Sequence, residues 1–591
     1  MKKIKPSKRQ KKISEKSLLT QNIPRKKYLK TLILIVVVGI AVYINTFGNE
    51  FVWDDKFLIT GNPHIKIWHS ISDIFKMELF HGKGPQGNFY RPLQTLSYMV
   101  DYSLWQIKPL GYHITNLCGH ILNALLIFFI VNVISKSRPV SLITSLLFIV
   151  HPIHTQAVTY IAGRADLLAA FFFLLSFLFF IRYTDYPGKK RIGIYLGSLL
   201  AFILALLSKE TTLILPLLLI LWYLSFRQEC AYPVSRVAYQ ISPFFLIAVV
   251  YIALRIFVLN FSGRSILTSS TNLYLRLLTM SKVTIAYLGL LFLPLNLHME
   301  RTIPFATSFF NLPVLISMIL LISIWIITAK FYKHSRVIFF ASFWFFLTLL
   351  PVSNIIPLNA VMAEHWLYIP SIGFFFLLAL GIVKMTQLKI PAFSPDILRR
   401  VTTSSFVLIL LFYSGLTIRR NTDWKDELTF YQKTLRSAPG SARVHNNLGM
   451  VYVKKGLYDE AIREYQAALR IDPNHSRTHY NLGNLYDEKG LYDEAVKEYR
   501  EALRIDPDNS GTHNNLGVVY DKKGLFNEAV KEYQEALRMD PNSKESHYNL
   551  GAICDEKGLY DEAVKEYQAV LRIDPNYRDT RKKLESVYQK R

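Results

Sequence analysis

Two adjacent carboxylates, Asp54 and Asp55, are the residues of this chain best suited to acid–base chemistry. They follow the first long apolar run, at about the point where a membrane-crossing chain would emerge into water. A positioned carboxylate can take the proton of a hydroxyl nucleophile, and neighbouring carboxylates raise each other's proton affinity. We therefore expect a general base here, with Asp54 slightly favoured. A cap or turn at the membrane edge is the structural alternative. A divalent cation held by both carboxylates is a further alternative.

Three basic residues, Arg91, Arg164 and Lys209, lie next to the predicted outer ends of apolar runs. Arg can contact a phosphate through two N–H groups, and Lys can act as a point charge, so the three predict a phosphate site. We expect Asp166 to pair with Arg164 and Glu210 to pair with Lys209. The alternative is that the three cations extend to lipid head groups.

Two histidines, His151 and His154, are three residues apart and would share one face of a helix. This spacing could hold a metal, but the sequence defines no third ligand, so packing or hydrogen bonding is favoured. We expect His113 and His120 to be structural polar residues at the edge of a span. The three cysteines show neither metal-ligand spacing nor a disulfide framework.

A membrane domain must position these residues. The chain has 591 residues, is 51% hydrophobic and has a mean hydropathy of +0.21, which is too apolar for one soluble domain. Its apolar runs are each near the ~20 residues needed to cross a bilayer. The first run should remain as a signal anchor. The runs cover residues 28–47, 112–134, 139–157, 165–183, 192–208, 211–226, 240–260, 273–297, 311–330, 337–352, 367–385 and 402–418.

The charge distribution predicts the orientation. From Arg419 to the end there are 29 basic and 29 acidic residues, so the net charge of +26 belongs to residues 1–418. The basic residues 1–27 predict a cytoplasmic tail, with binding to anionic lipid or RNA as the alternative. The basic loops all face the cytoplasm only if one run does not cross. We choose run 273–297, which carries Arg276 and Lys282, as an interfacial or re-entrant segment.

Eleven crossings then form the domain 28–418 and place four segments outside the cytoplasm. The first of these, the loop 48–110, holds the aspartate pair. The segments are residues 48–110, 261–310, 353–366 and 419–591.

A 34-residue period marks the C-terminal part of the chain, because Gly449, Gly483, Gly517 and Gly551 recur at that spacing. Each unit contains Asn-Leu-Gly, Glu-Ala and Asp-Pro, which is the pattern of the tetratricopeptide repeat (TPR), two antiparallel helices that stack into a solenoid. We predict a linker and half-repeat at 419–440, four repeats at 441–576 and a capping helix at 577–591.

Each repeat also has a His two residues before an Asn on its first helix. Side-chain amides donate and accept hydrogen bonds, so the asparagines could bind the backbone of an extended peptide along the concave groove. Repeat consensus is the alternative, and we expect the histidines to pack. The pairs are His445/Asn447, His479/Asn481, His513/Asn515 and His547/Asn549.

The membrane part resembles the glycosyltransferase C (GT-C) superfamily and, more closely, the transmembrane and tetratricopeptide-repeat O-mannosyltransferases. The resemblance runs from about Asn49 to Pro575. One departure is His365, where the resemblance would place an Arg; Glu364 and His365 are expected to support the site. The motifs that carry the resemblance are Phe51–Asp55 with Asn62-Pro63, Tyr90-Arg91-Pro92, Tyr112-His113 with Asn116 and His120, His151–Thr155, Gly163–Leu167, Ser208-Lys209-Glu210 and Glu364–Ser371.

This resemblance implies an all-α GT-C-like bundle followed by a TPR solenoid. It also implies inverting transfer of a sugar, with mannose one candidate, from a polyprenyl-phosphate carrier to a Ser/Thr hydroxyl of a protein held by the repeats. The partners would be membrane lipid and an acceptor protein or peptide, with no nucleic acid, no certain cofactor and a divalent cation left open. The Lys-rich tail favours a bacterial inner membrane over the endoplasmic reticulum, with the repeats on the external side.

Two other functions stay open. A membrane-anchored TPR scaffold would explain the solenoid but not the aspartate pair. A transporter would place its polar residues at mid-membrane rather than at the external ends.

Overall fold

The computed structural model describes residues 25–80, 89–183, 186–226, 234–259, 272–301, 303–358, 360–388 and 394–591. Most of the predicted basic tail, together with Arg227 and Cys230, lies outside the described residues. The chain divides into two compact units, residues 1–430 and 431–591. Every regular element of the described residues is a helix, which confirms the all-α prediction.

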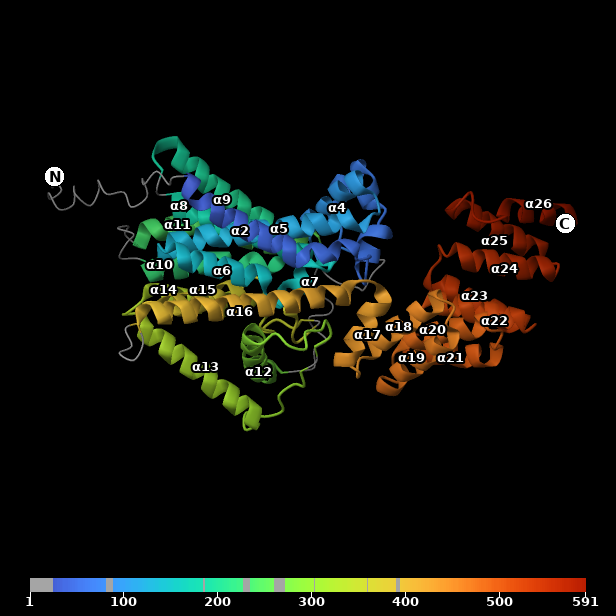
Figure 1. The fold of residues 1–591 in the computed structure, drawn as a ribbon. Coiled ribbons are helices and arrows are strands. Elements are labelled where there is room, and N and C mark those ends of the chain that lie inside the picture. The colour runs from blue at the N-terminus through green and yellow to red at the C-terminus, as the bar shows by residue number, and fades with distance from the viewer. Residues whose placement is uncertain are drawn as a thin grey trace. The chain divides into compact units, whose positions relative to one another are not determined.

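All twelve apolar runs are helical in the first unit (Figure 1). Within the described residues, eight helices are long and apolar enough to cross a membrane, or nine if the bent pair α6 and α7 is one span. Three apolar segments are shorter, so the number of crossings stays a prediction. The helices are α2 (Arg25–Tyr43), α3 (Ile71–Ile74), α4 (Pro92–Trp105), α5 (Pro109–Ser135), α6 (Arg138–Val150), α7 (Thr155–Val158), α8 (Arg164–Arg182), α9 (Gly188–Ser208), α10 (Leu215–Phe226), α11 (Val234–Ala253), α12 (Leu273–Phe292), α13 (Leu312–Phe331), α14 (Arg336–Leu349), α15 (Ser371–Met385) and α16 (Pro395–Asn421).

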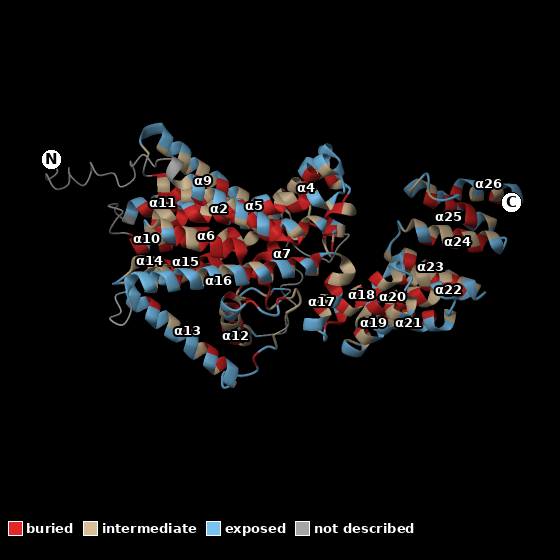
Figure 2. Ribbon diagram, in the orientation of Figure 1, coloured by how far each residue is buried: buried red, intermediate tan, exposed pale blue. Residues whose placement is uncertain are grey.

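Helices α5, α6, α8 and α15 form the centre of the bundle, and much of their surface is buried (Figure 2). Helices α13 and α16 instead expose apolar side chains, such as Leu408 and Leu411, along most of their length. Large exposed apolar surfaces mark regions that contact lipid or another protein. The outer helices therefore have the surface expected of membrane-facing elements.

Loops that are distant in the sequence meet at one end of the bundle. Asn49 Nδ2 donates a hydrogen bond to the carbonyl oxygen of Asn421 at 3.1 Å, across 372 residues of sequence. Elsewhere in the bundle, Arg138 Nε at the start of α6 donates to Thr31 Oγ1 of α2 at 3.1 Å. We call the end at which Asn49 meets Asn421 the site end; the chain passes through it at Asn49, Ala162, Lys209, Glu364 and Asn421.

Helix α12 contacts loops of the site end along its whole length. Arg276 Nη2, near its start, donates to the carbonyl oxygen of Ile355 at 3.2 Å. Tyr287 Oη, near its end, donates to that of Ala363 at 3.1 Å. Figure 1 shows α12 foreshortened beside α16, which is seen along its length, so the two helices run in different directions. These contacts favour a non-crossing helix, although α12 is long and apolar enough to cross.

The described parts of the first loop, residues 48–80 and 89–110, pack against the bundle. Its buried residues Leu58, Ile59 and Met99 form a small core with Tyr112 of α5 and with Ile161. Short helical turns and α4 carry these residues. The backbone next to the aspartate pair is therefore anchored on two sides.

The second unit is a solenoid of paired helices, as the 34-residue period predicts. A Cβ on Gly449 would lie 2.5 Å from the ring of Tyr465, so only glycine allows these two helices to approach closely. Gly456 has a φ of +71° in the turn that joins them. The helices are α17 (Glu427–Ser437), α18 (Ala442–Lys454), α19 (Tyr458–Ile471), α20 (Ser476–Glu488), α21 (Tyr492–Ile505), α22 (Ser510–Lys522), α23 (Phe526–Met539), α24 (Lys544–Glu556), α25 (Tyr560–Ile573) and α26 (Thr580–Lys590).

Candidate active site

A short segment, residues 160–166, organises the polar residues of the site end. It makes a 3-10 turn at Ile161–Gly163 and then begins α8. A Cβ on Gly163 would lie 2.6 Å from backbone carbonyl oxygens of the preceding turn, so a glycine is required there. Alternate residues of the segment bind different partners: Tyr160 contacts Asp54, Ala162 binds Asp55, Arg164 binds Asp101 and Asp166 binds Lys209.

Asp55 is buried and its carboxylate is hydrogen-bonded to the backbone. Oδ2 accepts from the N–H of Val52 at 3.0 Å, and Oδ1 accepts from the N–H of Ala162 at 2.8 Å. Burial raises the pKa of Asp55 well above its usual value, and the two backbone hydrogen bonds oppose this shift. The side chain therefore holds the first loop against the segment 160–166.

Asp54 is half-buried and lies beside the hydroxyl of Tyr160. Its backbone N–H donates to Tyr160 Oη at 3.2 Å. Burial raises the pKa of Tyr160, and the charges of Asp54 and Asp55 raise it further. The preceding residue, Trp53, has a left-handed φ of +52°, which costs about 1–2 kcal/mol in a non-glycine residue. Strained backbone of this kind is concentrated at functional sites.

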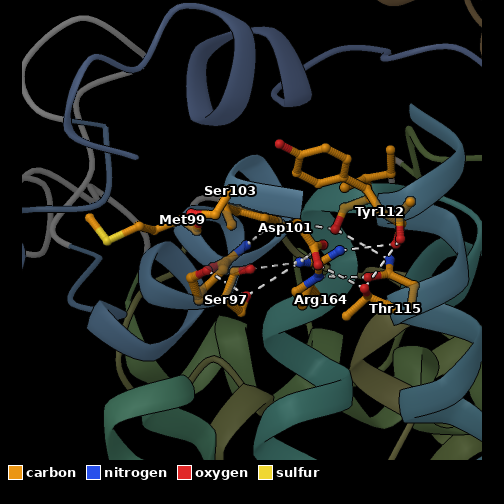
Figure 3. Close-up of polar contacts among 12 residues, drawn as sticks. Ser97, Met99, Asp101, Ser103, Tyr112, Thr115 and Arg164 are labelled. Carbon is orange, nitrogen blue, oxygen red and sulfur yellow. Dashed lines mark hydrogen bonds and ion pairs between the residues drawn. The ribbon is translucent and has the colours of Figure 1, made fainter. Parts of the chain in front are cut away.

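Arg164 lies in a buried network in which its guanidinium is satisfied by protein groups (Figure 3). It forms an ion pair with Asp101, and its Nε donates to Asn116 Oδ1 at 2.8 Å. Its Nη2 donates to the carbonyl oxygen of Tyr112 at 2.9 Å. These contacts argue against the predicted phosphate role, and the expected pair with Asp166 is wrong.

The other two cations are paired differently from the prediction. Arg91 binds Glu210, with Nη2 to Oε1 at 3.0 Å and Nε to Oε2 at 3.4 Å. Lys209 Nζ donates to Asp166 Oδ1 at 2.7 Å. The expected Lys209–Glu210 pair is therefore wrong. Adjacent side chains, such as Lys209 and Glu210, do not face each other, and neither do side chains two apart on a helix, such as Arg164 and Asp166.

The two ion pairs are neighbours. Burial lowers the pKa of Lys209; Asp166 opposes this, and the charges of Arg91 and Glu210 also act on the ammonium. His365 lies within reach of the same four charges. Burial, together with Lys209 and Arg91, lowers the pKa of His365 to about 3, so its imidazole is neutral at physiological pH. We call Arg91, Asp166, Lys209, Glu210 and His365 the cationic cluster.

Two residues next to this cluster, Tyr251 and Arg255, were not predicted from the sequence. The charge of Arg255 acts on Glu210, and the charges of Glu210, Arg255 and Arg91 act on Tyr251. Arg255 is the one charged residue of the apolar run 240–260, and this was the signal that could have found it.

Glu364 is fully buried and connects two segments of the site end. Its Oε1 accepts hydrogen bonds from the backbone N–H of His298 at 2.7 Å and from Arg301 Nε at 3.0 Å. Its Oε2 lies 3.7 Å from Arg420 Nη2 on α16. Glu364 thus connects the loop after α12 to the end of α16, and its supporting role in the site stays a prediction.

The histidines His151 and His154 do not lie on one helix face, because α6 ends at Val150 and a 3-10 turn follows. His151 Nδ1 accepts from the N–H of Ile153 at 3.2 Å, and the His154 ring packs 4.9 Å from that of Tyr368. No group of three potential metal ligands occurs among the described residues. Both side chains have packing and hydrogen-bonding contacts.

The four repeat histidines bind within the solenoid. In the first repeat, His445 Nδ1 lies 2.6 Å from Glu464 Oε2, and Nε2 lies 3.0 Å from the carbonyl oxygen of Pro439. The same two contacts recur at His479, His513 and His547. The histidines therefore join the two helices of each repeat.

The repeat asparagines are half-buried, and three of them bond to the preceding repeat. Asn481 Nδ2 donates to Asn446 Oδ1 at 2.9 Å, and Asn549 Nδ2 donates to Asn514 Oδ1 at 3.1 Å. Asn515 uses its amide twice, toward Tyr480 and Asn484. The side-chain oxygen Oδ1 of Asn447 accepts from Asn446 Nδ2 at 3.1 Å. Part of each amide's capacity thus stabilises the solenoid.

The fold and the site end together define a class: a multi-pass helical membrane protein that carries a TPR domain. The family model described as "Tetratricopeptide repeat" matches residues 440–508 and 514–578. A solved structure described as YrrB, a TPR protein with an unusual peptide-binding site, is 25% identical over 27% of this chain and 82% of that chain. Its TM-score of 0.25 is too low to support an inference.

Relatives that match about three quarters of the chain are more specific. A protein O-mannosyl-transferase of Caenorhabditis elegans is 29% identical over 74% of this chain and 62% of the relative. The protein O-mannosyl-transferase TMTC3 of Mus musculus is 26% identical over 73% of this chain and 50% of the relative. The chain is thus a homologue of the transmembrane and tetratricopeptide-repeat O-mannosyltransferases, and it spans between half and about three fifths of their length.

Proposed function

We propose that this protein is a membrane glycosyltransferase that moves a sugar from a polyprenyl-phosphate carrier to a Ser/Thr hydroxyl of a protein. The observation that carries the proposal is the meeting of Asp54 and the cationic cluster at one segment, residues 160–166. A base for an acceptor hydroxyl and cations for a phosphate are the two groups that such a transfer needs. The relatives named O-mannosyl-transferases support mannose as the sugar.

The reaction is a single inverting displacement. The acceptor hydroxyl oxygen attacks the anomeric carbon, the bond from that carbon to the phosphate oxygen breaks, and the lipid phosphate leaves. Asp54 takes the hydroxyl proton. Asp55 keeps the loop in place, because its carboxylate is bound to the backbone on both sides.

Arg91 and Lys209 stabilise the negative charge of the phosphate. Arg has five N–H donors and Glu210 takes two of them, while Lys has three and Asp166 takes one. Donors therefore remain for phosphate oxygens, and the two acids keep the cations in position. His365, being neutral, adds no further charge to the cluster.

The TPR solenoid binds the acceptor protein in this proposal. Its asparagines contact the backbone of an extended segment of the acceptor. They use the donors and acceptors that are not occupied by the hydrogen bonds between repeats. An attached binding domain raises the effective concentration of acceptor at the site. The proposal requires the solenoid and Asp54 to share the external compartment, in a bacterial inner membrane or in the endoplasmic reticulum.

The test uses the full chain in lipid nanodiscs, with radiolabelled polyprenyl-phosphate mannose and acceptor proteins. Asp54→Asn should reduce turnover about 10²–10⁴-fold while lipid binding is retained. Asp55→Asn should reduce it through a loosened loop, visible as faster proteolysis of residues 48–62. Full activity in Asp54→Asn would overturn the role of the base. Partner capture by the repeats without any transfer by the wild type would favour the scaffold.

A further inference from the structure

The end of α11 and the π-helical turn that continues it, Leu254–Val258, carry a polar face beside the cationic cluster. Tyr251 and Arg255 are four residues apart, so they lie on the same side of the helix. The ring centroid of Tyr251 lies 6.5 Å from that of Tyr90, the residue before Arg91. The charges of Glu210 and Arg91 act on Tyr251. This face is therefore directed toward the Arg91–Glu210 pair.

The hydroxyl of Tyr251 has no hydrogen-bond partner within the described residues, although the side chain is only 7% exposed. A buried hydroxyl without a partner costs about 1–3 kcal/mol, so such groups in native proteins call for an explanation. A ligand oxygen that accepts from Tyr251 Oη would remove this cost.

The charges of this region are unequal. Arg91, Lys209 and Arg255 face two carboxylates, those of Glu210 and Asp166, whereas the neighbouring Arg164–Asp101 pair is balanced. A net positive charge in a partly buried site is stabilised when an anion binds there. A phosphodiester, with a single negative charge, supplies one matching charge.

The helix is wider at this point, and its other side is apolar and exposed. Residues Leu254–Val258 form a π-helical turn, a feature that is frequent at functional sites. Phe257 and Val258 in the same turn are 78% and 71% exposed. Hydrocarbon can therefore cover the apolar side while a phosphate contacts the polar side, which is the arrangement that a lipid-linked phosphate needs.

We infer that Tyr251 and Arg255 form, with Arg91 and Lys209, the subsite for the phosphate of the lipid-linked donor. Tyr251 Oη donates to a non-bridging phosphate oxygen, and Arg255 neutralises the phosphate charge. The inference rests on the proposed function and assigns donor-binding residues to it. No bond is formed or broken by either residue.

The experiment measures equilibrium binding of radiolabelled polyprenyl phosphate to the full chain in nanodiscs, without turnover. Arg255→Gln should weaken binding roughly 10- to 100-fold, as expected for the loss of a charged contact, and Arg255→Lys should restore part of it. Tyr251→Phe, which removes only the hydroxyl, should weaken binding roughly 2- to 10-fold. Matched controls on the same helix are Arg236→Gln and Tyr239→Phe, both at its exposed opposite end.

Competition distinguishes the source of the phosphate. Unlabelled polyprenyl phosphate should displace the probe at far lower concentration than inorganic phosphate or a soluble sugar phosphate. Displacement by inorganic phosphate at the same concentration would overturn the lipid-linked assignment.

The outcomes separate this inference from the proposed function. If the wild type binds no polyprenyl phosphate, the proposed donor fails. If the wild type binds it, Arg91→Gln weakens binding and both α11 variants bind like their controls, then only the present inference fails. Size-exclusion chromatography of each variant confirms that weak binding is not caused by misfolding.

Discussion

Oδ1 of Asp55 accepts a hydrogen bond from the backbone N–H of Ala162 at 2.8 Å, although the two residues are 107 apart in the sequence. Together with the bond from Val52, this contact gives Asp55 a structural role that its neighbour Asp54 does not share. The two adjacent carboxylates, alike in sequence, therefore differ in environment. When two titratable groups lie close together, such a difference in environment assigns them different acid–base roles.

Asp55→Ala should destabilise the first loop, because two backbone N–H groups, the buried one of Val52 and the partly buried one of Ala162, lose their acceptor. The cost is about 1–3 kcal/mol for each group left unsatisfied. Thermal unfolding in detergent measures the loss, with Asp54→Ala as the matched control. An unfolding temperature that falls as far in Asp54→Ala as in Asp55→Ala would contradict the structural role of Asp55.

Removal of one partner from the buried Arg164–Asp101 pair should destabilise the bundle strongly. Arg164→Gln leaves the Asp101 carboxylate buried without its cation, at a cost of about 3–5 kcal/mol. The double variant Asp101→Asn/Arg164→Gln should lose less than the sum of the single variants, because neither charge is then left alone. Arg399→Gln, at an exposed position of α16, is the control. Additive losses in the unfolding measurement would show that the two charges are not coupled.

The solenoid should lose stability as pH rises above the usual histidine pKa of about 6.5. Each repeat histidine faces a carboxylate through Nδ1 and a backbone carbonyl through Nε2, and neither of these groups donates, so both nitrogens must be protonated. The carboxylate hydrogen bond raises the pKa of His445, His513 and His547, and burial opposes it. The pKa of His479 is also raised, although burial, the largest single effect there, acts in the opposite direction.

A raised folded pKa gives stability that is complete below the usual value of about 6.5 and is lost as pH rises through the folded value. Hydrogen exchange of α18 to α25 in the full chain, corrected for intrinsic rates, should show this loss. Replacement of all four histidines by Gln should remove it, whereas His475→Gln, at a histidine outside these pairs, should not. Exchange that is independent of pH in the wild type would contradict the assignment. The charged neighbours of the four rings are Glu464 and Arg470, Glu498 and Glu501, Glu532 and Glu535, and Glu566 and Arg572.

Glu556→Lys should stabilise the solenoid. Lys522 of the third repeat binds Asp487 of the second at 2.6 Å, but the equivalent position of the fourth repeat places Glu556 beside Asp521. Burial raises the pKa of Asp521, and Glu556 raises it further. A lysine at 556 would replace repulsion by an ion pair worth about 0.2–1 kcal/mol.

The comparison variant is Glu488→Lys, since the residue at the equivalent step of the first repeat is Val453; this change also removes the hydrogen bond that Tyr458 Oη donates to Glu488 at 2.6 Å, so no gain in stability is expected from it. Denaturant unfolding that follows the solenoid by tyrosine fluorescence measures both variants. An equal gain in the two would indicate an effect of net charge and not of the Asp521 contact.

The sequence by itself determined the elements of this protein. The 34-residue period defined the solenoid, because stacked repeats need the same glycine and alanine contacts at each step. The apolar runs defined the bundle helices, because a membrane span needs a continuous apolar stretch. The sequence also indicated the segments that meet at the site end. Each has acidic or basic residues next to an apolar run, where an ionisable side chain is costly unless it has a role.

Only the tertiary structure decided which charges meet. The sequence analysis paired Arg164 with Asp166 and Lys209 with Glu210, its close neighbours, whereas the structure pairs Arg91 with Glu210 and Lys209 with Asp166, 119 and 43 residues apart. Side chains one or two positions apart point in different directions, so ion pairs form between elements that the fold brings together. The fold also gives Asp54 and Asp55 different environments. It places Tyr251 and Arg255, which lie within one apolar run, beside the cations of the site.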